Sequence, residues 1–337
     1  MIGSALQFGI QLPTVLRLLG GFRPVLDTTS VHVRTVVRNF IPVFIGRGVV
    51  QLSAFADTII ARLLPEGAVA ALGNAQVLYT LPVSLFGMAV SAAELPEMSS
   101  ATGDAASVGV YLQERLNAGL RRIAFFVVPS AAAFLAFGGV IAGAVYQSGR
   151  FQRADSEYVW VILAGSAVGL LASTLGRLYS STYYALHESR NPLRYALIRV
   201  CLTIVLGVRF AIPLPHLLGI NARWGAAGLT ASAGIAGWVE FFLLRRKLEQ
   251  RIGAVDLSPT LISKLWIAAA IAAGVAFIAK HRIPYLTRAE FHPLSSAIYV
   301  LAPYGLMYLL LTGIFMVPQS KSLFERLRGH CGRFQMS

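Results

Sequence analysis

The sequence predicts an all-α polytopic membrane protein with about nine transmembrane helices, and three observations predict this class. Apolar residues make up 56% of the 337 residues, charged residues make up only 13%, and the mean hydropathy is +0.65. Apolar runs long enough to cross a hydrocarbon core, which needs about 20 helical residues, recur along the chain. Most basic residues stand between these runs, so the net charge of +14 indicates membrane loops rather than a nucleic-acid-binding surface.

The nine expected spans are separated by short polar connections. We place them at about residues 2–19, 39–64, 68–94, 120–146, 156–184, 194–214, 224–246, 262–280 and 294–317. Pro65, Glu66 and Gly67 form the turn between the second and third spans.

Basic residues between the spans indicate the orientation. When alternate loops are assigned to one side, 18 Lys and Arg residues fall on the side that holds the C-terminus and 7 on the other. Cytoplasmic loops carry the excess of positive charge, so we expect the N-terminus outside the cell and the C-terminus in the cytoplasm.

Residues 104–122 show a helical pattern outside the spans. Val108, Leu112, Leu116 and Leu120 share one face, opposite polar residues. This pattern predicts an interfacial helix on the inner leaflet, with a partner-binding helix as the alternative.

Later spans carry polar residues that have ordinary structural explanations. Asp155 and Ser156 stand in capping positions at the start of the fifth span. Arg199 and Arg209 lie near the ends of the sixth span, where snorkelling to the lipid phosphates is expected. The cysteines, Cys201 in an apolar run and Cys331 in the basic tail, predict no disulfide.

The stretch from Gln51 to Ser99 carries polar stripes on both of its apolar helices. At 100° per residue, the first helix gathers Arg47, Gln51, Thr58 and Arg62, with Asp57 on the flank, and the second gathers Gln76, Thr80, Gly87, Ser91 and Glu94. Polar groups at bilayer depth are costly, so both stripes should face a bundle interior or an aqueous cavity. Helix packing remains an alternative for Thr58, Thr80 and Ser91.

The sequence contains no pattern of an enzyme. It has no P-loop, no H-E-x-x-H and no Cys or His cluster with metal-ligand spacing. We therefore expect no catalytic residue, no cofactor and no metal.

The same stretch resembles helices seven and eight of the MurJ (MviN) family of lipid II flippases, in the MOP exporter superfamily. The resemblance rests on Q-x-x-x-x-x-D-T-x-x-A-x-x-L, the P-E-G turn, L-P-x-x-L-F-G and a closing L-P-x-x-S. It implies a protein that moves the lipid-linked peptidoglycan precursor across the bacterial inner membrane by alternating access.

The resemblance also implies a domain order. L-Q-x-x-x-Q-L-P near the start is similar to the end of helix six in the family, so the chain corresponds to helices six to fourteen without the first lobe. The expected segments are residues 1–20 (end of the first lobe), 21–38 (basic cytoplasmic loop), 39–247 (six-helix second lobe), 248–261 (linker), 262–317 (lipid-facing helix pair) and 318–337 (basic cytoplasmic tail). We expect a separately encoded first lobe or a second copy as partner.

The candidate substrate-binding residues are Arg47, Gln51, Asp57, Arg62, Gln76 and Arg177. A polyprenyl diphosphate-linked lipid is the implied cargo, and arginines bind such groups through charge-assisted, often bidentate hydrogen bonds. Arg177 falls on a basic position of the family by resemblance, and snorkelling to lipid phosphates is its alternative role.

One departure from the family weakens the functional expectation. The family carries Y-A-D-R in helix eight, whereas Asn74, Ala75, Gln76 and Val77 stand here. Three hypotheses follow: half of a lipid II flippase, a non-transporting membrane scaffold or degenerate remnant, and an exporter of another polyprenyl-linked glycan or a small amphiphile.

Overall fold

The computed structural model describes residues 2–18, 31–282 and 293–320, and all of its regular elements there are helical. The chain divides into two compact units, residues 1–41 and 42–337. The first unit holds α1 (Ile2–Leu18) and the beginning of α2 (Val31–Ala61), which continues into the second unit. The remaining elements are α3 (Ala68–Pro82), the π-helix η1 (Val83–Met88), α4 (Ala89–Ser99), α5 (Ala105–Tyr146), α6 (Arg153–Ala185), α7 (Arg190–Ala211), α8 (Pro213–Leu217), the 3-10 helix η2 (Ala222–Trp224), α9 (Gly225–Ile252), α10 (Pro259–Arg282) and α11 (Pro293–Ile314).

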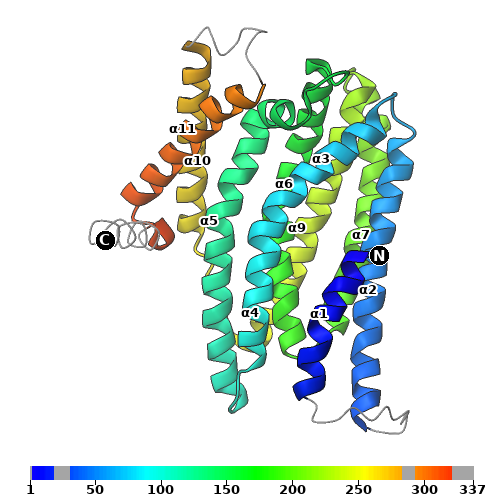
Figure 1. Ribbon diagram of the computed structural model, residues 1–337, viewed down its shortest axis with the longest axis vertical. Helices are drawn as coiled ribbons and strands as arrows, with labels where there is room; N and C mark the ends of the chain where they lie inside the picture. The colour runs from blue at the N-terminus through cyan, green and yellow to red at the C-terminus, as the bar shows by residue number, and fades with distance from the viewer. Residues whose placement is uncertain (1, 19–30, 283–292, 321–337) are drawn as a thin grey trace. The chain divides into compact units, whose positions relative to one another are not determined.

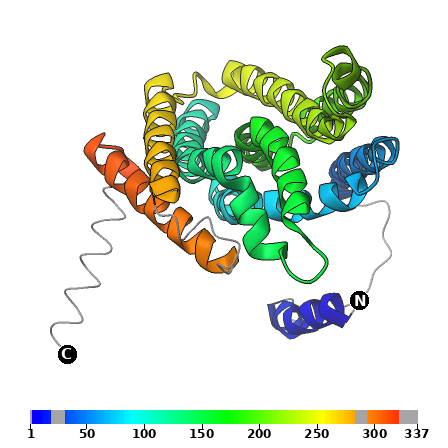
Figure 2. The same ribbon diagram turned by 90° about the horizontal axis from the view of Figure 1, so that it is seen from above.

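The second unit is organised around α6. Its neighbours are α5 on one side and α9 on the other, α7 packs beyond α9, and α3 and α4 also pack against α6 (Figures 1 and 2). The last two long helices, α10 and α11, pair with each other and lean on α5. At the closest approach of α6 and α9, a Cβ built on Gly169 would lie 2.3 Å from the Cα of Gly234, so this crossing requires glycine.

The described helices confirm the apolar runs that the sequence predicts. Seven of them, from the α3–η1–α4 run to α11, are long and apolar enough to cross a membrane. The first two expected spans, about 2–19 and 39–64, are helical as α1 and as part of α2. The predicted turn also holds, because Gly67 takes a left-handed conformation with φ 87° directly before α3.

The prediction of an interfacial helix at residues 104–122 is wrong. These residues form the first part of α5, a continuous helix of 42 residues that is about 63 Å long and exceeds the roughly 30 Å hydrocarbon core. Leu112, Leu116 and Leu120 are at most 1% exposed, because they pack inside the protein instead of facing lipid.

The caps of two helices explain where they begin. Asp104 is the N-cap of α5, where its carboxylate accepts from the N–H of Ser107 at 3.3 Å. At α6 the N-cap is Gln152, and Asp155 closes a capping box by accepting from the Gln152 N–H at 2.8 Å. The capping role of Asp155 is therefore confirmed, whereas Ser156 is a buried residue of the first turn rather than the N-cap.

Candidate functional site

The predicted polar stripe on the second helix of the hairpin divides between two environments. Gln76 and Thr80 on α3 are exposed, whereas Gly87, Ser91 and Glu94 are buried. The reason is the π-helix η1, which follows Pro82, contains Gly87 and precedes Ser91 and Glu94. A π-helix has more residues per turn than an α-helix, so the residues after it are rotated relative to a uniform 100° pattern, and the prediction of one common stripe is wrong.

The predicted site residues of the second unit are placed as follows. Gln51 is exposed on α2, and Arg62 is exposed just beyond the end of that helix. Gln76 is exposed on α3, where its amide contacts the Thr80 hydroxyl at 3.5 Å. Asp57 is half-buried on α2, and its Oδ1 atom is buried without a hydrogen-bond partner among the described residues. Arg47 belongs to α2, but its side chain lies outside the described residues.

Arg177 belongs to a polar stripe along α6. At 100° per residue, one narrow face of this helix gathers Ser166, Ser173, Arg177, Ser180 and Tyr184. All five are exposed or half-buried, whereas Leu171, Leu175 and Leu178 on the opposite face are buried. The apolar face of α6 is buried, whereas serine, arginine and tyrosine side chains on its other face are accessible. This pattern is typical of a helix that lines an aqueous cavity.

A hydrogen bond joins this α6 stripe to α3. The hydroxyls of Tyr79 and Ser173 lie 2.7 Å apart, and α3 packs along α6. Gln76 lies on α3 one turn or less from Tyr79, so the structure brings the predicted residue Gln76 and the Ser173–Arg177 segment to neighbouring helices. Sequence reasoning missed Tyr79 and Ser173, although the serine spacing on the fifth span was a usable signal.

A second polar cluster lies where α2, α7 and α9 meet. Arg199 on α7 contacts Glu240 on α9 at 3.0 Å, and its charge also acts on the Asp57 carboxylate. The prediction that Arg199 snorkels to lipid phosphates is therefore wrong, because the protein supplies its partner. The side chains of Arg199 and Glu240 are 32% and 15% exposed, so this pair is partly buried and ties α7 to α9.

The end of α2 packs against α7 and α9 one turn beyond Asp57. There, Ile60 is 5% exposed and lies 3.6 Å from a Cβ built on Gly207 of α7, and that same Cβ would meet Ser232 of α9 at 3.4 Å. Thr203, one turn before Gly207, is 1% exposed and its hydroxyl is unpartnered among the described residues. Sequence reasoning could not pair Arg199 with Glu240, because they stand on separate spans.

A third cluster joins the end of α4 to α5. Glu94 is 5% exposed, and its carboxylate lies 3.0 Å from Arg115 and 3.9 Å from Arg122. Glu97 also approaches Arg115, at 3.5 Å. This cluster balances its charges internally, so it ties two helices together rather than offering an open charge to a ligand. Within the described part of the chain, no group of three or more His, Cys, Asp or Glu residues has the arrangement of a metal site.

Seven apolar spans, an ion pair between two of them and polar faces on their helices define a polytopic α-helical integral membrane protein. The family model described as "Lipid II flippase MurJ" matches residues 1–297. The chain therefore belongs to the MurJ family.

Individual relatives agree with this assignment. The "Probable lipid II flippase MurJ" of Rhizobium meliloti (strain 1021) is 30% identical over 288 residues, which cover 84% of this chain and 49% of that protein. The "Lipid II flippase MurJ" of Burkholderia cenocepacia is 29% identical over 263 residues, which cover 77% of this chain and 48% of that protein. The chain thus spans about half the length of these relatives.

A solved structure shares the fold. The structure described as "Lipid II flippase MurJ, inward closed conformation" superposes on this chain with a TM-score of 0.67 at 22% identity. The superposition covers 93% of this chain and 60% of that one.

Proposed function

We propose that this chain forms the second lobe of a flippase that carries a polyprenyl diphosphate-linked peptidoglycan precursor, lipid II, across the bacterial inner membrane. The observation that carries the proposal is the polar stripe on α6, with Arg177 at its centre and Tyr79 bonded to Ser173 at its side. Arginine and hydroxyl groups within a span are costly against lipid, and they suit a water-filled path for a phosphorylated headgroup.

The open face of the bundle needs a partner. Gln51, Arg62, Gln76 and Arg177 are all exposed, and the relatives contain a further half that this chain does not match. A first lobe that corresponds to that half, or a second copy of this chain, would enclose these side chains in a central cavity. Alternating access then consists of the two lobes opening that cavity to one side of the membrane at a time.

Two further parts of the proposal concern placement and energetics. The C-terminus lies in the cytoplasm, as the 18-to-7 asymmetry of basic residues predicts. No covalent chemistry is needed, because a flippase supplies only a cavity whose charges suit the cargo. The cluster of Asp57, Arg199 and Glu240 is the proposed place where a coupling cation or proton acts, since the buried Oδ1 atom of Asp57 has no hydrogen-bond partner among the described residues.

A membrane scaffold that does not transport is the second candidate. It is favoured by Val77, which is 59% exposed where the family carries an arginine. An exporter of another polyprenyl-linked glycan uses the same cavity and differs from the first candidate only in its cargo.

The experiment is lipid retention and complementation with single variants. The chain is expressed with the first lobe of a relative in cells depleted of their own flippase, and bound polyprenyl diphosphate lipid is measured after purification. We expect Arg177→Leu and Arg47→Leu to lower both growth and lipid retention. Arg209→Leu is the control, because Arg209 is exposed near the end of α7.

The membrane-inserted amount of each variant is compared first, so that loss of folding is separated from loss of function. Equal lipid retention in the parent chain and all three variants would reject the flippase and favour the scaffold. Retention of a different polyprenyl-linked glycan in place of the precursor would reassign the cargo.

A further inference from the structure

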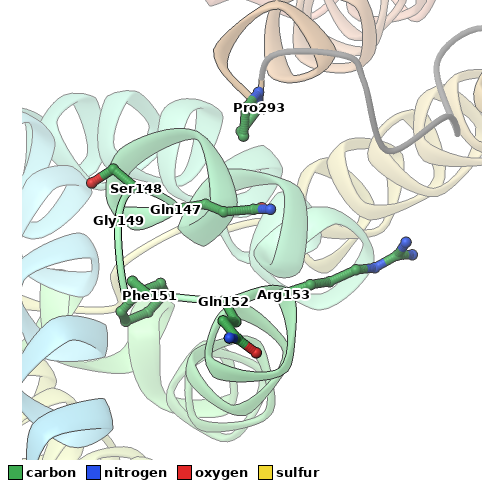
Figure 3. Close-up of a pocket in the computed structure, with 7 residues that line it drawn as sticks. All are labelled: Gln147, Ser148, Gly149, Phe151, Gln152, Arg153 and Pro293. Carbon is green, nitrogen blue, oxygen red and sulfur yellow. The ribbon is translucent and has the colours of Figure 1, made fainter.

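A recess lies at the end of the bundle where α5 turns into α6, away from the polar stripe on α6. Its volume is about 360 Å³, and it is lined by Gln147, Ser148, Gly149, Phe151, Gln152, Arg153 and Pro293. The first five belong to the α5–α6 connection, Arg153 is the first residue of α6, and Pro293 is the first residue of α11 (Figure 3). In Figure 3 the Gln147 amide and the Arg153 guanidinium extend toward the same side of this connection.

The α5–α6 connection is held in a fixed shape by its own contacts. The N–H of Gln147 donates to Gly143 at 2.9 Å, and the N–H of Phe151 donates to Ser148 at 3.1 Å. Gly149 between them takes a positive φ of 59°, which favours glycine. The Tyr146 and Phe151 rings pack with centroids 5.7 Å apart, so the recess is a preformed part of the fold.

The charge around the recess is positive. Arg150 stands on the connection, Arg153 begins α6, and Lys280, near the end of α10, is close enough to Arg153 for their charges to repel. The carboxylate of Asp155 is occupied by the capping box. Glu157 reaches Arg153 at 3.4 Å, but both side chains are mostly exposed, so this pair is weak and easily exchanged for another anion.

Neutral donors are also available at the recess. Within the described residues, neither the Gln147 amide nor the Ser148 hydroxyl has a hydrogen-bond partner. Figure 3 shows the Ser148 hydroxyl pointing away from the Gln147 amide and the Arg153 guanidinium, so this amide and this guanidinium form the donor pair, which matches the oxygens of a phosphate monoester or diester.

The position relative to the membrane indicates where such a phosphate comes from. The recess lies where α5 ends and where α6 and α11 begin, and the ends of membrane-spanning helices stand at the level of the lipid headgroups. Val145, Ile278 and Leu294 are exposed. Val145 and Leu294 stand one or two residues further into their spans than Gln147 and Pro293, and Ile278 stands two residues before Lys280 on α10. An apolar surface directly below a cationic recess suits a phosphate that carries acyl or prenyl chains.

We propose that this recess binds the phosphate of a lipid headgroup. The proposal is independent of the proposed flippase function, because it uses none of the polar residues of the α6 stripe. On the predicted orientation, the lipid belongs to the outer leaflet.

The test is native mass spectrometry of the purified chain with three probes: phosphatidylglycerol, undecaprenyl phosphate and inorganic phosphate. The double variant Arg153→Gln and Gln147→Ala loses a charge-assisted donor and an amide. We expect it to bind lipid roughly tenfold more weakly than the parent chain. Arg246→Gln is the matched control, because Arg246 is an exposed arginine toward the opposite end of α9, and it should bind lipid like the parent chain.

Millimolar inorganic phosphate should leave the lipid bound, because it gains nothing from the apolar surface. Efficient competition by inorganic phosphate would keep the phosphate chemistry and reject the lipid as its source. Equal lipid binding by the parent chain and the double variant, or an equal drop in the Arg246→Gln control, would overturn the proposal. Thermal unfolding of each variant shows whether the double variant is folded, and Arg153→Lys, which keeps the charge, should retain most of the binding.

Discussion

The Tyr308 hydroxyl donates a hydrogen bond of 2.7 Å to the carbonyl oxygen of Phe125, the carbonyl that Pro129 leaves without its usual helical donor. Proline has no N–H, so the 125–129 bond of α5 cannot form. A residue of α11 supplies the donor instead, from a position 183 residues away. This bond fixes where α11 rests on α5 and shows that the last helix is docked by polar contacts as well as apolar ones.

Tyr308→Phe should therefore destabilise the protein by about 1–3 kcal/mol, because a buried carbonyl loses its donor. Tyr304→Phe is the matched comparison. Tyr304 donates at 2.7 Å to the Pro129 carbonyl, which lies inside the continuous helix α5 and also accepts from the backbone N–H one turn later. Thermal or denaturant unfolding in detergent measures both variants, and a larger loss in Tyr304→Phe would contradict this account.

The N-cap of α5 should respond to acid. The hydrogen bonds from Ser107 hold the pKa of the Asp104 carboxyl below its ordinary value of 3.8. A pKa that is lowered in the folded state means that the cap stabilises the helix end at neutral pH. That contribution begins to fall as the pH drops toward 3.8 and is lost below the folded-state pKa.

Hydrogen exchange of the amides of residues 105–108 at several pH values measures this loss. Asp104→Asn keeps a capping oxygen without the titration, so its protection should vary less with pH. Asp104→Ala should lose protection at every pH. The same acid response in Asp104→Asn as in the parent chain would show that another group titrates.

The sequence was sufficient to place the spans, because hydropathy over 20 residues is a local property. It was insufficient for the start of α5, since Leu112 and Leu116 at helical spacing look the same whether they face lipid or another helix. Only the packed structure shows that they are buried, with α5 continuing beyond the length of a span.

The candidate site shows the same limit. The stripe from Gln76 to Glu94 assumed a uniform helix, and the π-helix after Pro82 rotates its second half into the bundle. Arg177 was found by resemblance, but its neighbours Ser173 and Tyr79 required the contact between α6 and α3. The roles of Arg47, Gln51 and Arg62 stay predictions, since no contact in the described structure tests them.

The cluster at the end of α4 should respond differently to removal of its acid and its base. Arg115→Met leaves the buried Glu94 carboxylate with only the distant Arg122, so it should cost about 1–3 kcal/mol, a value reduced for the partial exposure of Arg115. Glu94→Leu removes the buried charge together with its desolvation cost, and should cost less. Glu97→Gln is the control, because Glu97 is largely exposed. Unfolding measurements that rank Glu94→Leu as the most harmful of the three would contradict this order.

Variants of Arg199 and Glu240 should show whether this ion pair contributes only to stability or also to transport. Arg199→Met leaves Glu240, whose side chain is 15% exposed, without its partner, and should destabilise the protein by about 1–3 kcal/mol after allowance for the partial exposure of Arg199. Glu240→Leu in the same chain removes the uncompensated carboxylate, so the double variant should regain most of that stability, with a coupling energy of about 0.5–3 kcal/mol in a double-mutant cycle. If the cluster with Asp57 also serves cation coupling, the double variant should fold well and still fail to support growth together with the first lobe of a relative. A double variant that is stable and fully active would show that the ion pair only joins α7 to α9 and would leave the coupling role without support.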